Sequence, residues 1–173
     1  MKVRAVILAV MVIAVILLIV YFIDLPPTEN TLIANFRAHR STYERLKLNL
    51  QADDQLGRLT QRGIQTTSLV SYMPPKGSSE RARFDEYLTL LSEVHGLGVD
   101  RAPGLHPQFC VEMWGRGWAA DTEHISVCWL EEIVRGKQVS SIDDINWDAD
   151  NSAGKRQFFY RKIEGNWYLE RDG

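Results

Sequence analysis

Two stretches decide the fold: FCVEMW at residues 109–114 and HISVCWL at residues 124–130. In both stretches apolar residues alternate with smaller or polar ones, which is typical of a strand with one buried face. The stretches pair best as an antiparallel hairpin in which the numbers of facing residues add to 238, because the apolar residues then share one side. This register predicts three facing pairs on that side: Phe109 with Trp129, Val111 with Val127, and Met113 with Ile125.

The same register fixes what lies on the other side of the hairpin. It predicts that Cys110 faces Cys128, Glu112 faces Ser126, and Trp114 faces His124. Facing Cα atoms lie about 4.5 to 5.5 Å apart, which a disulfide can span. We therefore expect a disulfide between the two cysteines, with two unpaired small core residues as the alternative.

Helical periodicity appears on the N-terminal side of the hairpin. Residues with spacings of 4, 3, 4, 3 and 4 predict one helix from Thr31 to about Gln51: Leu32, Phe36, His39, Tyr43, Leu46 and Leu50. Ser78 and Ser79 are cap candidates for a second helix, which Gly96 ends. Residues 64–72 between the helices suit a strand.

Further strands are expected at residues 157–163 and 166–170, with a tight turn at residues 164–166. The order of helix, strand, helix and then several adjacent strands predicts an α+β fold, with an antiparallel β-sheet packed by two α-helices. One N-terminal transmembrane helix is expected to precede this domain.

A membrane anchor is predicted from residues 5–23, which begin with Ala5, end with Ile23 and contain no charge. A helix of this length is roughly 28 Å long and can span a bilayer once. A cleavable signal peptide is the alternative, but it requires a shorter apolar region and small residues at its end. The predicted division is a cytoplasmic N-terminus at 1–4, the anchor at 5–23, a linker at 24–30 and an extracytoplasmic α+β domain at 31–173.

The flanking charges predict the orientation of this anchor. Lys2 and Arg4 precede it, whereas Asp24 and Glu29 follow it, and the positive end of a span stays in the cytoplasm. If the cell is bacterial, we therefore expect a single-pass protein of the cytoplasmic (inner) membrane, with its domain in the periplasm or extracellular space. An oxidising compartment also favours the disulfide.

Composition excludes several classes of protein. The chain has 20 Lys plus Arg, 22 Asp plus Glu and 45% hydrophobic residues, unlike a disordered tail, a collagen-like repeat or a basic nucleic-acid binder. Removing residues 1–23 leaves 173 − 23 = 150 residues with 20 − 2 = 18 basic and 22 acidic side chains. This mildly acidic domain suits a basic partner, and no nucleic acid is expected.

Candidate chemistry is confined to one face of the hairpin. Acid–base or nucleophilic catalysis could use Glu112, His124 and Ser126, but no G-x-S-x-G motif surrounds the serine. A polar patch without catalysis is the favoured interpretation. The histidines and cysteines lack the spacing of a zinc site, so neither a metal nor a cofactor is predicted.

Loose motifs give the chain a family resemblance. F-x-x-H-R-x-x-Y-E-x-L begins at Phe36, and N-W-Y-L begins at Asn166. The chain resembles an uncharacterised family of small bacterial membrane-anchored envelope proteins and lipoproteins. The resemblance implies an envelope location and no established activity. This chain departs from the family in having no lipidation cysteine and in having the Cys110 and Cys128 pair.

Taken together, these patterns predict an anchored extracytoplasmic binding protein. Its expected contacts are the lipid bilayer, through residues 5–23, and a protein partner, as a subunit of an envelope complex or as a toxin-immunity protein. The alternatives are a small membrane-tethered hydrolase using Glu112, His124 and Ser126, or a domain that binds a small apolar ligand.

Overall fold

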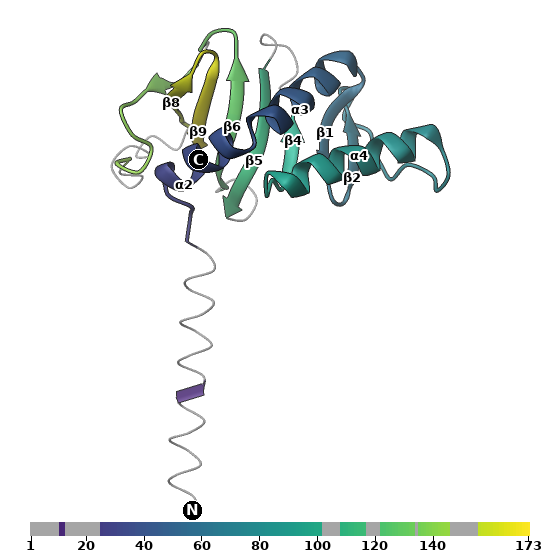
Figure 1. Ribbon diagram of the computed structural model, residues 1–173, viewed down its shortest axis with the longest axis horizontal. Helices are drawn as coiled ribbons and strands as arrows, with labels where there is room; N and C mark the ends of the chain where they lie inside the picture. Colours follow the sequence, from purple (N-terminus) through teal and green to yellow (C-terminus); the bar gives the residue numbers. More distant parts are fainter. Residues whose placement is uncertain (1–10, 13–24, 102–107, 117–121, 134, 146–155) are drawn as a thin grey trace, which may run out of the picture.

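Three helices cover one face of a nine-stranded sheet in the part of the chain that the structure describes (Figure 1). The structure is a computed structural model and describes residues 11–12, 25–101, 108–116, 122–133, 135–145 and 156–173. The helices are α2 (Glu29–Ala38), α3 (Arg40–Ala52) and α4 (Ser79–Glu93). The strands are β1 (Leu56–Thr60), β2 (Gly63–Thr66), β3 (Ser71–Tyr72), β4 (Gly98–Asp100), β5 (Gln108–Arg116), β6 (Glu123–Leu130), β7 (Lys137–Gln138), β8 (Phe158–Glu164) and β9 (Trp167–Asp172).

The sheet has the order β3-β2-β1-β4-β5-β6-β9-β8-β7. Every neighbouring pair is antiparallel except β7 and β8, which run parallel. The α+β class is confirmed, but the sheet is mixed and not purely antiparallel as predicted. Strands β1 and β4 were not predicted, because both are short and neither has a long alternating pattern.

The predicted hairpin register is correct for the first half of β5. Phe109 faces Trp129, and the pairing continues without a shift to Glu112, which faces Ser126. Beyond Glu112 a β-bulge shifts the register, so that Trp114 faces Ile125 and Gly115 faces His124. The predicted pairs of Met113 with Ile125 and Trp114 with His124 are therefore wrong. The extra residue allows the consecutive apolar residues Met113 and Trp114 both to pack against the main core.

The predicted helix at residues 31–51 is interrupted at His39. This residue has φ −115° and ψ 25°, so it ends α2 and begins α3. Its N–H donates to the carbonyl of Asn35, and its own carbonyl accepts from Thr42 and Tyr43. The apolar spacing continues across the break, which is why the sequence predicts one helix where there are two. From residue 25 onward the described residues thus form three helices, where two were predicted to pack on the sheet.

The second predicted helix is confirmed as α4, and Ser78 caps it by accepting a hydrogen bond from the N–H of Arg81 at 3.0 Å. The predicted strand at residues 64–72, in contrast, is two strands. A turn separates β2 from β3, and Leu69 lies in it with φ +65°, which few residues other than glycine adopt.

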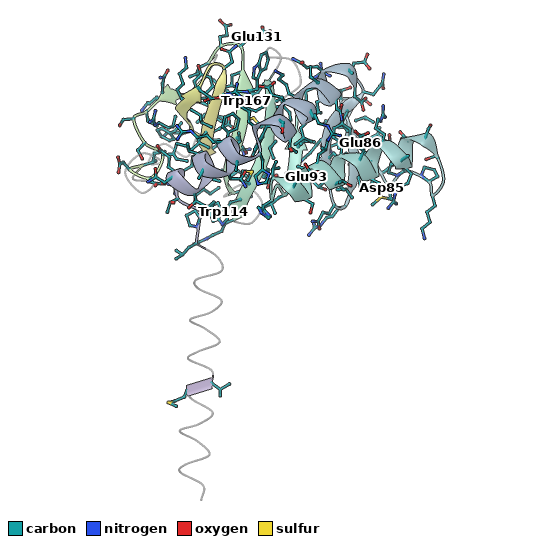
Figure 2. The ribbon with its side chains drawn as sticks, viewed as in Figure 1. Asp85, Glu86, Glu93, Trp114, Glu131 and Trp167 are labelled. Carbon is teal, nitrogen blue, oxygen red and sulfur yellow. A yellow bond between two sulfur atoms is a disulfide. The ribbon has the colours of Figure 1, made fainter. Side chains whose placement is uncertain are left out.

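An aromatic cluster joins the helices to the sheet. Trp167 of β9 is 2% exposed, and its ring centroid lies 5.2 Å from that of Phe36, 5.9 Å from that of Tyr43 and 5.9 Å from that of Phe109. Figure 2 shows Trp167 on the part of the sheet that α2 and α3 cover. Its indole N–H donates to a carboxylate oxygen of Glu44 at 3.0 Å, which satisfies the polar atom of a buried ring.

Glu29 attaches the start of α2 to strand β8, near one edge of the sheet, and to the segment between β7 and β8. The carboxylate of Glu29 accepts from the N–H of Ile142 at 2.9 Å and pairs with Arg161 of β8 at 3.1 Å. The N–H of Glu29 in turn donates to the carboxylate of Asp143 at 3.0 Å. Helix α2 therefore begins inside the range predicted as a linker, at residues 24–30.

The predicted anchor, from Ala5 to Ile23, lies outside the described residues except for Met11 and Val12, which are helical. Among the described residues, no helix is both long enough and apolar enough to cross a bilayer.

Candidate functional site

The sheet face opposite α2, α3 and α4, here called the helix-free face, carries the candidate chemistry. Alternation sends Val111 and Val127 into the main core, so their neighbours Glu112 and Ser126 point the other way. No helix of the described part of the chain covers this face. All three predicted site residues, Glu112, His124 and Ser126, come from its strands β5 and β6.

Glu112 is the centre of a charged group on this face. One carboxylate oxygen accepts from Arg58 Nη2 of β1 at 2.7 Å, and the other lies 3.3 Å from His124 Nδ1. The Glu112 side chain is 16% exposed and that of His124 is 22% exposed, so both interactions are partly shielded from water. The sequence prediction grouped Glu112 with His124 correctly, although by a register that the bulge changes.

The pKa values of Glu112 and His124 move apart. The hydrogen bond to Glu112 raises the pKa of His124 against the opposing effect of burial. Burial raises the pKa of Glu112, but the hydrogen bond from His124 and the positive charge of Arg58 outweigh it, so the pKa lies below its ordinary value. The pair is therefore an ionic contact when His124 is protonated.

Two glycines leave the space that this group needs. Gly98 of β4 lies between Thr60 of β1 and Glu112 of β5, so no side chain separates Arg58 from the glutamate. A Cβ at Gly115 would lie 3.0 Å from both Glu112 Oε1 and His124 Nδ1. The bulge places Gly115, and not Trp114, opposite His124, so it is the bulge that allows these two side chains to meet.

Ser126 is less suited to catalysis than the other two predicted residues. It is 7% exposed and lies between Glu112 of β5 and Glu170 of β9. Among the described residues, its hydroxyl makes no hydrogen bond to His124. The structure therefore brings together an acid–base pair without a nucleophile bonded to it.

The disulfide is formed as predicted, between Cys110 and Cys128, with the two sulfur atoms 2.08 Å apart. It is buried beside Tyr160 and Tyr168 in a small second cluster on the helix-free face. A carboxylate oxygen of Glu170 lies within 4.8 Å of both sulfur atoms. The sulfur atoms are bonded to each other, so they are not thiolate ligands for a metal in this state.

Glu170 is a buried carboxyl that the sequence analysis did not single out. It accepts hydrogen bonds from Gln108 at 3.3 Å and from the hydroxyl of Tyr160. Burial raises its pKa to about 7, against the lowering effect of Tyr160. No motif marks this residue in the sequence, because its burial comes from strands far apart in the chain.

We expect the stability of the protein to depend on the ionisation of Glu170. The folded-state pKa lies above the ordinary value of about 4.5, so the contribution of this group is full below about pH 4.5 and is lost as the pH rises through about 7. The stability difference between wild type and Glu170→Gln should therefore change by on the order of 3 kcal/mol in favour of the variant between about pH 5 and about pH 8. Urea unfolding of both proteins at each pH measures it, and a pH-independent difference would contradict it.

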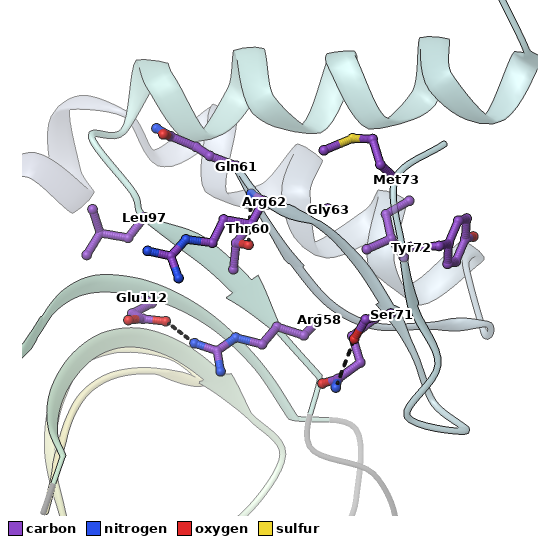
Figure 3. Close-up of a pocket in the computed structure, with 12 residues that line it drawn as sticks. Arg58, Thr60, Gln61, Arg62, Gly63, Ser71, Tyr72, Met73, Leu97 and Glu112 are labelled. Atoms are coloured by element: carbon purple, nitrogen blue, oxygen red, sulfur yellow. Dashed lines mark hydrogen bonds and ion pairs between the residues drawn. The ribbon is translucent and has the colours of Figure 1, made fainter. Parts of the chain in front are cut away.

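A groove opens beside this charged group (Figure 3). It has a volume of about 780 Å³, within the range of small-molecule and peptide sites. The residues that line it come from β1, β2, β3, the connecting turns and β5: Arg58, Thr60, Gln61, Arg62, Gly63, Ile64, Gln65, Ser71, Tyr72, Met73, Leu97 and Glu112. Arg58 and Glu112 thus belong both to the charged group and to the groove wall.

A second cavity lies between α3 and the sheet. Its lining includes Leu50, Phe109 and Trp129, and its volume is about 20 Å³. Pockets for small ligands typically have about 300 to 1,000 Å³, so this space adds no support for the apolar-ligand alternative.

The sequence analysis missed both arginines of the groove. Arg58 lies on a strand that was not predicted, and its partner Glu112 is 54 residues away. The segment from Leu56 to Thr66 contains the available signal, because polar residues and Gly63 stand between Leu59 and Ile64 as the turn of a short hairpin would. Searches against protein-family models, curated proteins and solved structures found no match to this chain, so the family resemblance stays a prediction.

Proposed function

We propose that this protein is a single-pass, membrane-anchored extracytoplasmic binding protein, and that its partner docks in the groove on the helix-free face. The observation that carries this proposal is the groove of about 780 Å³, whose wall contains an arginine held in place by Glu112. A guanidinium whose position is already fixed loses little conformational freedom when it binds.

Two further features support the extracytoplasmic part of the proposal. Residues 5–23 are long and apolar enough to form an anchor, and the charges that flank them favour a domain outside the cytoplasm. The disulfide between Cys110 and Cys128 is of the kind that persists in an oxidising compartment. The proposed roles are a subunit of an envelope complex or an immunity protein.

The hydrolase alternative has less support. Glu112 and His124 form the acid–base pair that such an enzyme needs, but the pair also has a plain structural use in holding Arg58. Ser126 is buried and is not hydrogen-bonded to His124, so it lacks the base that would activate it as a nucleophile.

Site-specific photo-crosslinking in intact cells tests the binding function. A photoreactive residue at Gln61, which is exposed at the groove, should give a discrete crosslinked product on irradiation. If the binding site is the groove, Arg58→Ala should reduce the yield of this product several-fold, because the charged contact is lost. The proposed orientation has a separate test, in which protease added to spheroplasts should digest the domain from outside.

The matched control carries the same photoreactive residue at Glu86, which is exposed on α4 (Figure 2), pairs with Arg45 of α3 and is not part of the groove lining. The proposal fails if positions 61 and 86 give the same products, or if Arg58→Ala leaves the yield at position 61 unchanged. A domain that resists external protease while a cytoplasmic reporter at the C-terminus is active would reverse the proposed orientation.

A further inference from the structure

We propose that the groove binds an extended, carboxylate-rich segment of the partner protein, and that Arg58 and Arg62 make the charged contacts. The inference rests on the binding function proposed above and adds the chemistry of the partner. It differs from the expectation based on net charge, because the domain is acidic as a whole while the groove is locally basic.

The first argument is the charge balance of the groove. Its lining contains two arginines and one carboxylate, that of Glu112. This carboxylate is already engaged by Arg58 on one oxygen and by His124 on the other. Asp100 of β4 faces Arg58 from the neighbouring strand and its carboxylate interacts electrostatically with that arginine, so the positive charge left for a ligand anion is mainly that of Arg62.

The second argument is the number of free donors on Arg58. A guanidinium has five N–H donors in a planar fork, and Glu112 accepts from Nη2 alone. The side chain of Arg58 is 41% exposed, so its other donors are accessible from the groove. A carboxylate fits this fork in two parallel hydrogen bonds.

The third argument is the position of Arg62 in the turn between β1 and β2. Its backbone N–H donates to the hydroxyl of Thr60 at 3.2 Å, which fixes the turn. Gly63 follows with φ +137°, and a Cβ there would lie 2.6 Å from the carbonyl oxygen of Tyr72. Among the described residues, the Arg62 side chain has no ion-pair partner. Figure 3 shows both guanidinium groups at the end of the groove where Leu97 and Glu112 lie.

The remaining lining favours a peptide over a compact anion. Gln65 and Ser71 lie across the neighbouring strands β2 and β3 and offer neutral hydrogen-bonding groups, as a peptide backbone requires. Met73 and Leu97 are each 46% exposed and are suited to apolar side chains on either side of the carboxylates. A phosphate ion would engage only the arginine end of this surface.

Fluorescence anisotropy with the full chain in detergent micelles tests the inference. The probes are two labelled eight-residue peptides, one alternating Glu with Leu and the other alternating Lys with Leu. We expect the Glu peptide to bind and the Lys peptide not to bind, with affinity falling as salt rises. Arg62→Ala should weaken the Glu peptide about tenfold, as expected for a hydrogen bond to a charged group.

The control variant is Arg37→Ala, which removes an exposed arginine from α2, away from the groove, and should leave affinity unchanged. Because Arg62 is exposed and holds no other side chain, its replacement should not unfold the protein.

Several results would overturn the inference. These are equal binding of both peptides, an Arg62→Ala variant that binds like wild type, inorganic phosphate that competes as well as the Glu peptide, or binding only to vesicles that contain phosphatidylglycerol. If the peptide-binding test fails while position 61 still gives a crosslinked product, a carboxylate-rich partner is excluded and the proposed binding function remains.

Discussion

Replacing Trp167 by alanine is expected to lower the free energy of unfolding by about 3 to 5 kcal/mol, the usual cost of removing a large buried aromatic side chain. The indole contacts the rings of Phe36, Tyr43 and Phe109, which come from α2, α3 and β5. Its loss would leave a cavity where both helices meet the sheet. For a domain of this size the melting temperature should fall by about 10 °C.

Two other variants separate the contributions of Trp167. Trp167→Phe keeps most of the ring and removes the N–H that donates to Glu44, so it should cost about 1 kcal/mol beyond the change in packing. Trp129→Ala is the matched control, because Trp129 faces Trp167 from β6 but is only partly buried. Chemical denaturation gives all three values, and an equal loss for Trp167→Ala and Trp129→Ala would show that the cluster is not the centre of the core.

Removing the disulfide by Cys110→Ala with Cys128→Ala is expected to cost about 3 kcal/mol in the chain-entropy account. The two cysteines are 18 residues apart, so the bond closes a short loop in the unfolded chain. In the folded state the pair is nearly inaccessible, since Cys110 is 7% exposed and Cys128 is 0% exposed. Because buried thiols would also resist alkylation in the folded state, the test uses unfolded protein: the unreduced wild-type protein should show no alkylatable thiol even after unfolding in denaturant.

Mass spectrometry of protein from its native compartment tests the bond, and denaturant unfolding of wild type and the double variant tests its contribution. The single variants serve as controls, because each removes one sulfur atom and leaves one buried thiol. Two cysteines that alkylate when the unreduced protein is unfolded, or a double variant as stable as wild type, would contradict the prediction.

The sequence predicts local pairings well where a single periodicity holds. The register from Phe109 to Glu112 follows from simple alternation, and with it the disulfide. The same reasoning fails at Met113 and Trp114, because alternation assigns consecutive residues to opposite faces and has no rule for two neighbours on one face. It fails at His39 for a related reason, since the apolar spacing is unbroken although the backbone is not.

The candidate site is predictable only in part, because its residues come from strands far apart in the chain. Glu112 and His124 lie on one hairpin, so the sequence can group them. Arg58 joins them from β1 across β4, and this contact requires Gly98 to be recognised as a strand residue and not as part of a turn. The buried position of Glu170 likewise depends on how β6, β8 and β9 assemble.

The attachment of Glu29 has a mechanical consequence. A tensile load that enters the domain from the N-terminal side at Pro27 reaches the first turn of α2 immediately. There the bonds from Glu29 to Ile142, Asp143 and Arg161 transfer it to β8 and to the loop before that strand. Strand β8 is hydrogen-bonded to β9 along its length, so the force is shared among several backbone hydrogen bonds in the sheet. The groove is lined by residues of β1 to β3, by Leu97 and by Glu112 of β5, and none of these belongs to β8 or β9, so it lies outside this load path.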